Sequence, residues 1–169
     1  MKIKNFLAIM MAAVTLSMSA VSCDDDDDDD NETLAEEVAD SYLGDMTLTV
    51  MGSASEYDSV TFVLTAETDN TISLTTPAIG EGSMALPALT VNGLELTKNT
   101  VAGVDIITVS VDEITGSIEV NGETKNYTFS GLNIAVSPAA ETASIAYSLQ
   151  YGKMPMAMVV AFTGSEVED

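Results

Sequence analysis

The sequence predicts an all-β fold, an antiparallel meander of eight to ten short strands. Apolar and polar residues alternate with period two from about residue 46, and no 12-residue window beyond it has a convincing helical period. Dipeptides such as Asn121-Gly122 punctuate the pattern as tight turns do. With no helix long enough for a crossover connection, such a meander closes as a barrel or, alternatively, folds as a two-sheet β-sandwich.

Residues 1–22 are typical of a secretory signal and not of the fold. Lys2 and Lys4 precede an apolar run at residues 6–16, which is shorter than the about 20 residues of a membrane span. The sequence Ala-Val-Ser-Cys that ends at Cys23 resembles the cleavage site of bacterial lipoproteins, with alanine where leucine is most common. We therefore expect acylation of Cys23, the only cysteine; the alternative is an ordinary signal peptide with a coincidental cysteine.

An uninterrupted acidic run follows the cysteine: Asp24, Asp25, Asp26, Asp27, Asp28, Asp29 and Asp30. Like charges in a block repel one another, which favours a solvated spacer. The cysteine and acidic run together also resemble the surface-export signal of Bacteroidetes lipoproteins, and the two interpretations are compatible. We expect an outer-membrane protein held by the lipid on Cys23 at the cell surface, with a periplasm-facing anchor as the alternative.

The charge balance excludes one class of partner. After loss of residues 1–22 the chain keeps three lysines and no arginine against 27 acids, a formal charge of −24. Eleven of these acids lie in residues 24–40. A chain without a basic face does not bind nucleic acid.

The chain divides into four expected parts. Residues 1–22 are the signal peptide, 23–40 the acylated cysteine with its acidic disordered tether, 41–164 the β domain and 165–169 an acidic tail. A short helical turn at residues 33–39 is marginal on length alone, and we assign it to the end of the tether.

Three dipeptides are predicted to form two-residue hairpin turns, and each predicts a register. Asn92-Gly93 would pair Val91 with Leu94 and Leu89 with Leu96, and Asn121-Gly122 would set Ile114 opposite Phe129. Gly152-Lys153 would pair four apolar positions in succession: Tyr151 with Met154, Leu149 with Met156, Tyr147 with Met158, and Ile145 with Val160.

The opening strand carries a second resemblance. The pattern Gly44-x-x-Thr47-Leu48-Thr49-Val50, behind an acidic tether, resembles the calycin-like (lipocalin-like) lipoproteins of Bacteroides across about residues 41–164. True lipocalins carry a tryptophan near this strand, and this chain has none. The resemblance implies a lipocalin-like barrel and carries over no catalytic or binding residue.

Composition argues against an enzyme. The chain has no histidine, and Cys23 is expected to carry the lipid, so the usual general base, metal ligand and thiolate nucleophile are absent. The acids of Asp112-Glu113 and of residues 67–70 are interpreted as solvated turns. We expect no catalytic residue, cofactor or metal.

The candidate functional residues concern binding. Met154, Met156 and Met158, with Tyr147 and Phe129, are candidates to line a pocket for an apolar ligand, although methionines more often fill a core. Ser59, in Asp58-Ser59-Val60, resembles a Bacteroides O-glycosylation site.

Two functions remain open. The first is a surface lipoprotein that binds a small apolar, lipid-like molecule inside the barrel. The alternative is an adhesion or assembly module with a filled core that binds a protein or glycan through its outer surface. Inward aromatic residues that fill the centre would favour the alternative.

Overall fold

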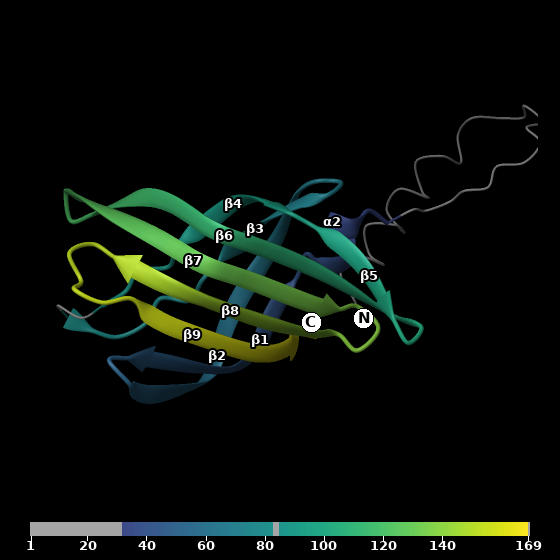
Figure 1. Ribbon diagram of the computed structural model, residues 1–169, viewed down its shortest axis with the longest axis horizontal. Coiled ribbons are helices and arrows are strands. Elements are labelled where there is room, and N and C mark those ends of the chain that lie inside the picture. Colours follow the sequence, from purple (N-terminus) through teal and green to yellow (C-terminus); the bar gives the residue numbers. More distant parts are fainter. Residues whose placement is uncertain (1–31, 83–84, 169) are drawn as a thin grey trace, which may run out of the picture.

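The computed structural model describes residues 32–82 and 85–168, which form a nine-stranded antiparallel sheet curved into a nearly closed barrel (Figure 1). The predicted all-β meander and barrel are confirmed. Along the sheet the strands follow the order β4-β3-β2-β1-β9-β8-β7-β6-β5. Their bounds are β1 Ser41–Val50, β2 Ser53–Thr68, β3 Thr71–Thr75, β4 Thr90–Glu95, β5 Thr97–Val101, β6 Val104–Val120, β7 Glu123–Ser137, β8 Thr142–Tyr151 and β9 Met158–Glu166.

The two ends of the barrel differ. Helix α2 (Leu34–Val38) lies at one end with the β2–β3, β5–β6 and β7–β8 turns, and we call this the helix end (Figure 1). The β1–β2 and β6–β7 turns, the β8–β9 loop and the long connection between β3 and β4 lie at the other end, which we call the open end.

Four aromatic rings pack together in the core of the barrel. The centroids of Phe62 and Phe162 lie 4.5 Å apart, and those of Phe129 and Tyr147 lie 4.9 Å apart. An edge contact between Phe62 and Tyr147, at 6.5 Å, joins the two pairs. All four side chains are at most 3% exposed, and their contacts link β2 to β7, β8 and β9 through the core.

Helix α2 belongs to the folded domain, so its assignment to the tether was wrong. Thr33 and Glu36 form a reciprocal capping box at its start. Ala35 and Val38 are fully buried, and the Tyr42 hydroxyl donates a hydrogen bond of 3.0 Å to the Val38 carbonyl. Tertiary packing therefore stabilises a helix that its length alone would not.

At the other boundary, β9 continues to Glu166, which pairs with Tyr42, so the strand includes the first residues assigned to the acidic tail.

The Asn121-Gly122 hairpin is confirmed. Both residues have positive φ (53° and 79°), as a type I′ turn requires, and Ile114 pairs with Phe129.

The Asn92-Gly93 hairpin was wrong. Both residues lie within β4, where Val91 pairs with Leu74 and Leu94 pairs with Ile72, so two residues form a β-bulge opposite one. The positive φ of Gly93, 70°, serves a bulge as well as a turn. The register nevertheless keeps the four apolar residues on the buried side, as the hairpin predicted: Leu89, Val91, Leu94 and Leu96 are all buried.

The β8–β9 hairpin was predicted in the wrong register. Leu149 pairs with Met158 and Ile145 with Phe162, two residues further along β9 than expected. A shift of two keeps the same face inward. Pro155 lies in the connection of residues 152–157, since a residue without an N–H is unsuited to a paired strand.

The seam between β4 and β6 is closed by a side chain. These strands make tertiary contacts but are not hydrogen-bonded neighbours in the sheet. The Tyr127 hydroxyl crosses the seam and donates a 3.2 Å hydrogen bond to the Thr90 carbonyl. Its ring lies over Gly116, the residue it pairs with on β6, where an added Cβ would be 2.4 Å from the ring.

Gly116→Ala is expected to displace the Tyr127 ring and break its bond to Thr90. We expect a loss of about 1–3 kcal/mol in the free energy of unfolding, as for other overpacked sites. Urea denaturation measures it, and amide hydrogen exchange should show faster exchange across β4. Thr115→Ala, at an exposed neighbour, is the control; equal stability of the two variants would contradict the role of the seam.

Alkaline stability should depend on Tyr42. Burial, then the charges of Glu166 and Asp40, raises the pKa of Tyr42, so the folded state holds the phenol neutral. The unfolded chain ionises this phenol near its ordinary pKa of about 10, so stability present below that pH is lost as pH rises above it.

Tyr42→Phe should therefore show a shallower loss of stability above about pH 10. The same variant should be about 1 kcal/mol less stable at neutral pH, because the bond to Val38 is lost. Urea denaturation at a series of pH values measures both effects. An alkaline slope identical to that of the parent protein would refute the assignment.

Candidate functional site

The five candidate pocket residues do not form one site. Phe129, Tyr147 and Met158 are 0%, 3% and 5% exposed and lie in the core. Met154 lies in the β8–β9 loop, partly buried against the core, whereas Met156 in the same loop is 49% exposed.

A set of half-buried apolar side chains marks the open end of the barrel. They belong to the parts of the strands nearest the open end, and they pack against the core. We call them the rim: Leu48, Val50, Tyr57, Ile114, Ile118, Tyr127, Tyr151 and Met154. Side chains that are apolar yet incompletely covered leave surface on which a ligand can bury apolar area.

The rim is continuous with the aromatic cluster beneath it. The ring of Tyr127 meets that of Phe129 edge-on at 5.8 Å, and Tyr127 pairs with Tyr151 on the neighbouring strand. The β8–β9 loop is tied to β7 by a 2.7 Å hydrogen bond from the Gly152 N–H to the Asn126 carbonyl. Gln150 holds the carbonyl of Met154, which fixes the rim methionine in place.

A lysine lies beside this apolar surface. Lys125 has the same strand parity as Tyr127, and its Cδ lies 3.8 Å from the position that a Cβ on Gly152 would take. Its ammonium pairs with Glu123 at 2.6 Å, and the hydrogen bond and charge of Glu123 raise the pKa of Lys125. Lys153 follows in the adjacent loop. Lys125 therefore lies beside the rim, and Lys153 is next to the rim residue Met154 in the sequence.

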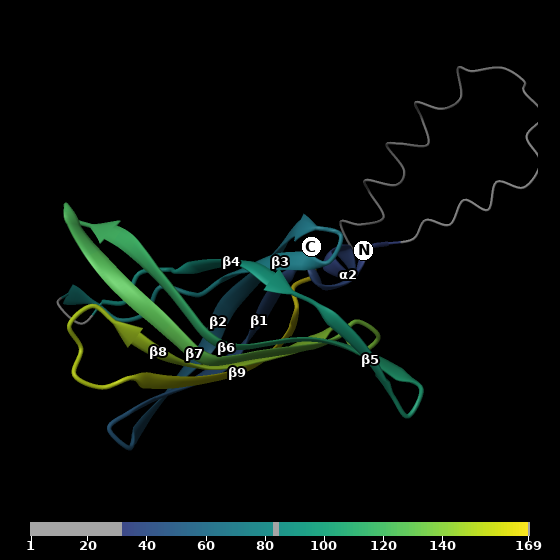
Figure 2. The same ribbon diagram turned by 45° about the horizontal axis from the view of Figure 1, so that its top comes forward.

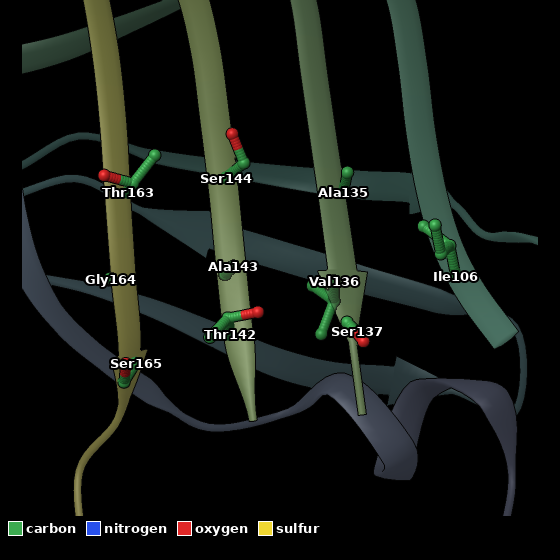
Figure 3. Close-up of a pocket in the computed structure, with 10 residues that line it drawn as sticks. All are labelled: Ile106, Ala135, Val136, Ser137, Thr142, Ala143, Ser144, Thr163, Gly164 and Ser165. Atoms are coloured by element: carbon green, nitrogen blue, oxygen red, sulfur yellow. The ribbon is translucent and has the colours of Figure 1, made fainter. Parts of the chain in front are cut away.

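A second hollow lies on the outside of the sheet, near the helix end (Figure 3). Its volume is about 450 Å³, and no charged residue lines it. The lining residues are Ile106, Ala135, Val136, Ser137, Thr142, Ala143, Ser144, Thr163, Gly164 and Ser165.

The remaining candidates lie apart from both places. Ser59 is exposed at a β-bulge of β2 and has a positive φ of 57°. Glu67 accepts a 2.7 Å hydrogen bond from the Gly93 N–H and so supports the β4 bulge. Cys23 and the aspartates Asp24 to Asp30 lie outside the described residues.

Within residues 32–82 and 85–168, no group of three or more acidic, histidine or cysteine side chains could hold a metal ion. No helix in those same ranges has the length and apolar character to cross a membrane.

Sequence reasoning missed most of the rim. Leu48, Val50 and Ile118 alternate with polar residues, which indicates one buried face, but this alternation does not show that they lie at an uncovered end of the barrel. The signal was their position next to the turns at Met51-Gly52 and Asn121-Gly122, where an inward side chain has neighbours on one side only.

Comparison with known proteins supports the barrel. No curated protein matches the sequence at a significant level. A crystal structure of a putative outer membrane protein from Bacteroides fragilis is similar, with a TM-score of 0.58 and 18% sequence identity. The similarity covers 80% of this chain and 53% of that one, so this chain spans about half the length of its structural relative. The model of the calycin-like beta-barrel domain matches residues 38–165, and the chain belongs to that family.

Proposed function

We propose that this protein is a lipid-anchored, non-enzymatic outer-membrane lipoprotein that binds a small amphipathic molecule at the rim of its barrel. The observation that carries the proposal is the rim itself, a set of partly buried apolar side chains that pack against the core. The ligand is expected to lie across the open end and not to enter the centre.

The aromatic cluster supports binding at the rim. Phe62, Phe129, Tyr147 and Phe162 are in ring contact across the barrel, and α2 packs its buried residues at the helix end. A ligand deep in the barrel would have to displace these rings, which would forfeit their contacts.

The lysines favour an anionic head group. In a chain of formal charge −22, an acidic molecule is repelled by most of the surface. At the rim, Lys125 is held beside Tyr127 and Tyr151, and Lys153 is close in sequence to Met154. A fatty carboxylate fits this chemistry: its chain covers the rim and its head group competes with Glu123 for Lys125.

The anchor supports an orientation. Acylation of Cys23 would leave nine residues before Thr33, a tether of at most about 30 Å when fully extended. Since α2 begins at Leu34, the helix end would face the membrane and the rim would face outward at the cell surface. Ser59 remains a proposed modification site because it is exposed.

A second candidate function is an assembly module that acts through the outer surface. The uncharged hollow on the outside of the sheet favours it.

Two methionines of one loop provide the test. Titration calorimetry with dodecanoate, below its micellar concentration, should show binding to the parent chain. Met154→Asp should weaken it at least about tenfold, since a charge would face the buried chain. Met156→Asp, at a position that is 49% exposed, should leave it unchanged.

Lys125→Gln should weaken dodecanoate severalfold but not dodecanol, because only the carboxylate uses the ammonium. No heat with either probe, or equal losses from the two methionine variants, would reject ligand binding at the rim.

A further inference from the structure

Most residues on the outward side of the sheet between β1 and β5 are small and uncharged. The register aligns one row across six strands: Asp45, Thr163, Ser144, Ala135, Thr108 and Thr97. All six belong to the outward-facing alternation of their strands, opposite in parity to the core. Asp45, at one edge, is the only charge in the row.

The rows on either side have the same character. Toward the helix end, Leu43 pairs with Ser165, Ser165 with Thr142 and Thr142 with Ser137. Toward the open end, the row consists of Thr47, Ala161, Ala146, Asn133 and Ser110. Neither row contains a charged residue. In a chain with 27 acids, three successive rows with one acid form a distinct surface, which we call the outer face.

The outer face is hollowed in the middle and bounded by apolar side chains. The hollow of about 450 Å³ lies between β6 and β9 (Figure 3). Beside it the β5–β6 hairpin projects from the barrel (Figure 2), and its cross-strand pair Val101 and Val104 is 60% and 46% exposed. At the opposite edge Leu43 is 44% exposed.

We infer that a second copy of this chain covers the outer face. Two strongly acidic molecules repel each other over most of their surfaces, and the outer face is where that repulsion is weakest. Six strands and three rows span about 25 Å by about 20 Å, so two faces bury roughly 1,000 Å² in total. That area suits a weak, reversible dimer.

A two-fold axis parallel to the strands satisfies the remaining observations. It reverses the strand order, so the hairpin tip of each copy, with Val101 and Val104, lies over the edge that carries Leu43 in the other. It also keeps both α2 helices at the same end, as anchoring in one membrane requires. This last point rests on the proposed lipid anchor, which would also raise the local concentration of the two copies.

Sedimentation equilibrium in reducing buffer tests the dimer without a membrane. The chain from Cys23 onward, which contains every described residue, should dimerise at concentrations of tens to hundreds of micromolar. Ser144→Glu places like charges near the centre of both faces and should raise the dissociation constant at least about tenfold. Thr65→Glu, an equal charge at an exposed position on β2, should leave it unchanged.

Val101→Asp at the hairpin tip is a second variant, should Ser144→Glu disturb the sheet, and it should weaken the dimer as well. A parent chain that stays monomeric at about 0.5 mM, above the expected dimerisation range, would overturn the inference. So would a dimer that neither variant weakens. Met154→Asp leaves the outer face intact, so failure of ligand binding at the rim and failure of dimerisation are separate results.

Discussion

The contacts among Phe62, Phe129, Tyr147 and Phe162 are the interaction on which the rest of the structure depends. These rings come from β2, β7, β8 and β9, so one cluster joins distant parts of the sheet through the interior. The chain has no tryptophan and four phenylalanines, and three of those four lie in this cluster. The inward side chains nearer the open end lie beyond this cluster and form the rim. The proposed ligand site is therefore the rim and not the space that the rings occupy.

The distribution of charge separates the surface into regions that differ in their capacity for association. Lysines are few: Lys98 forms ion pairs with Glu37 of α2 and Asp105 of β6, and Lys125 pairs with Glu123 beside the rim. The acids give the surface its solubility and limit association to places where charge is absent. The outer face is such a place, and the rim lies on another part of the barrel, so a proposed ligand at the rim and a partner on the outer face would not compete.

Strand alternation and one Asn-Gly turn could be predicted from the sequence because both are local. Ile114 opposite Phe129 follows from a two-residue turn whose φ values only a few residue types adopt. Gly93 shows the limit, since the same backbone conformation makes a turn or a bulge depending on the neighbouring strand, Ile72 to Leu74. The register of β8 on β9 was wrong because Pro155 lengthened the loop, while the inward face was right because the shift was even.

The candidate site was less predictable because it depends on which inward residues lie at the end of the barrel. Met154 and Met158 have the same parity in the sequence pattern, yet Met154 lies at the rim whereas Met158 is 5% exposed in the core. Only the position of the loop at residues 152–157 separates them. The burial of Ala35 and Val38 was equally non-local, since the helix is stabilised by contacts with Tyr42 and the strands around it.

The central claim is that the aromatic cluster keeps a ligand at the rim. Methionine methyl NMR with dodecanoate tests this most directly, because intermolecular nuclear Overhauser effects arise only between atoms in close contact. The account predicts such effects at Met154 and none at Met46, which is 1% exposed. Effects at Met46 as strong as those at Met154 would contradict it, since the ligand would then have entered the barrel.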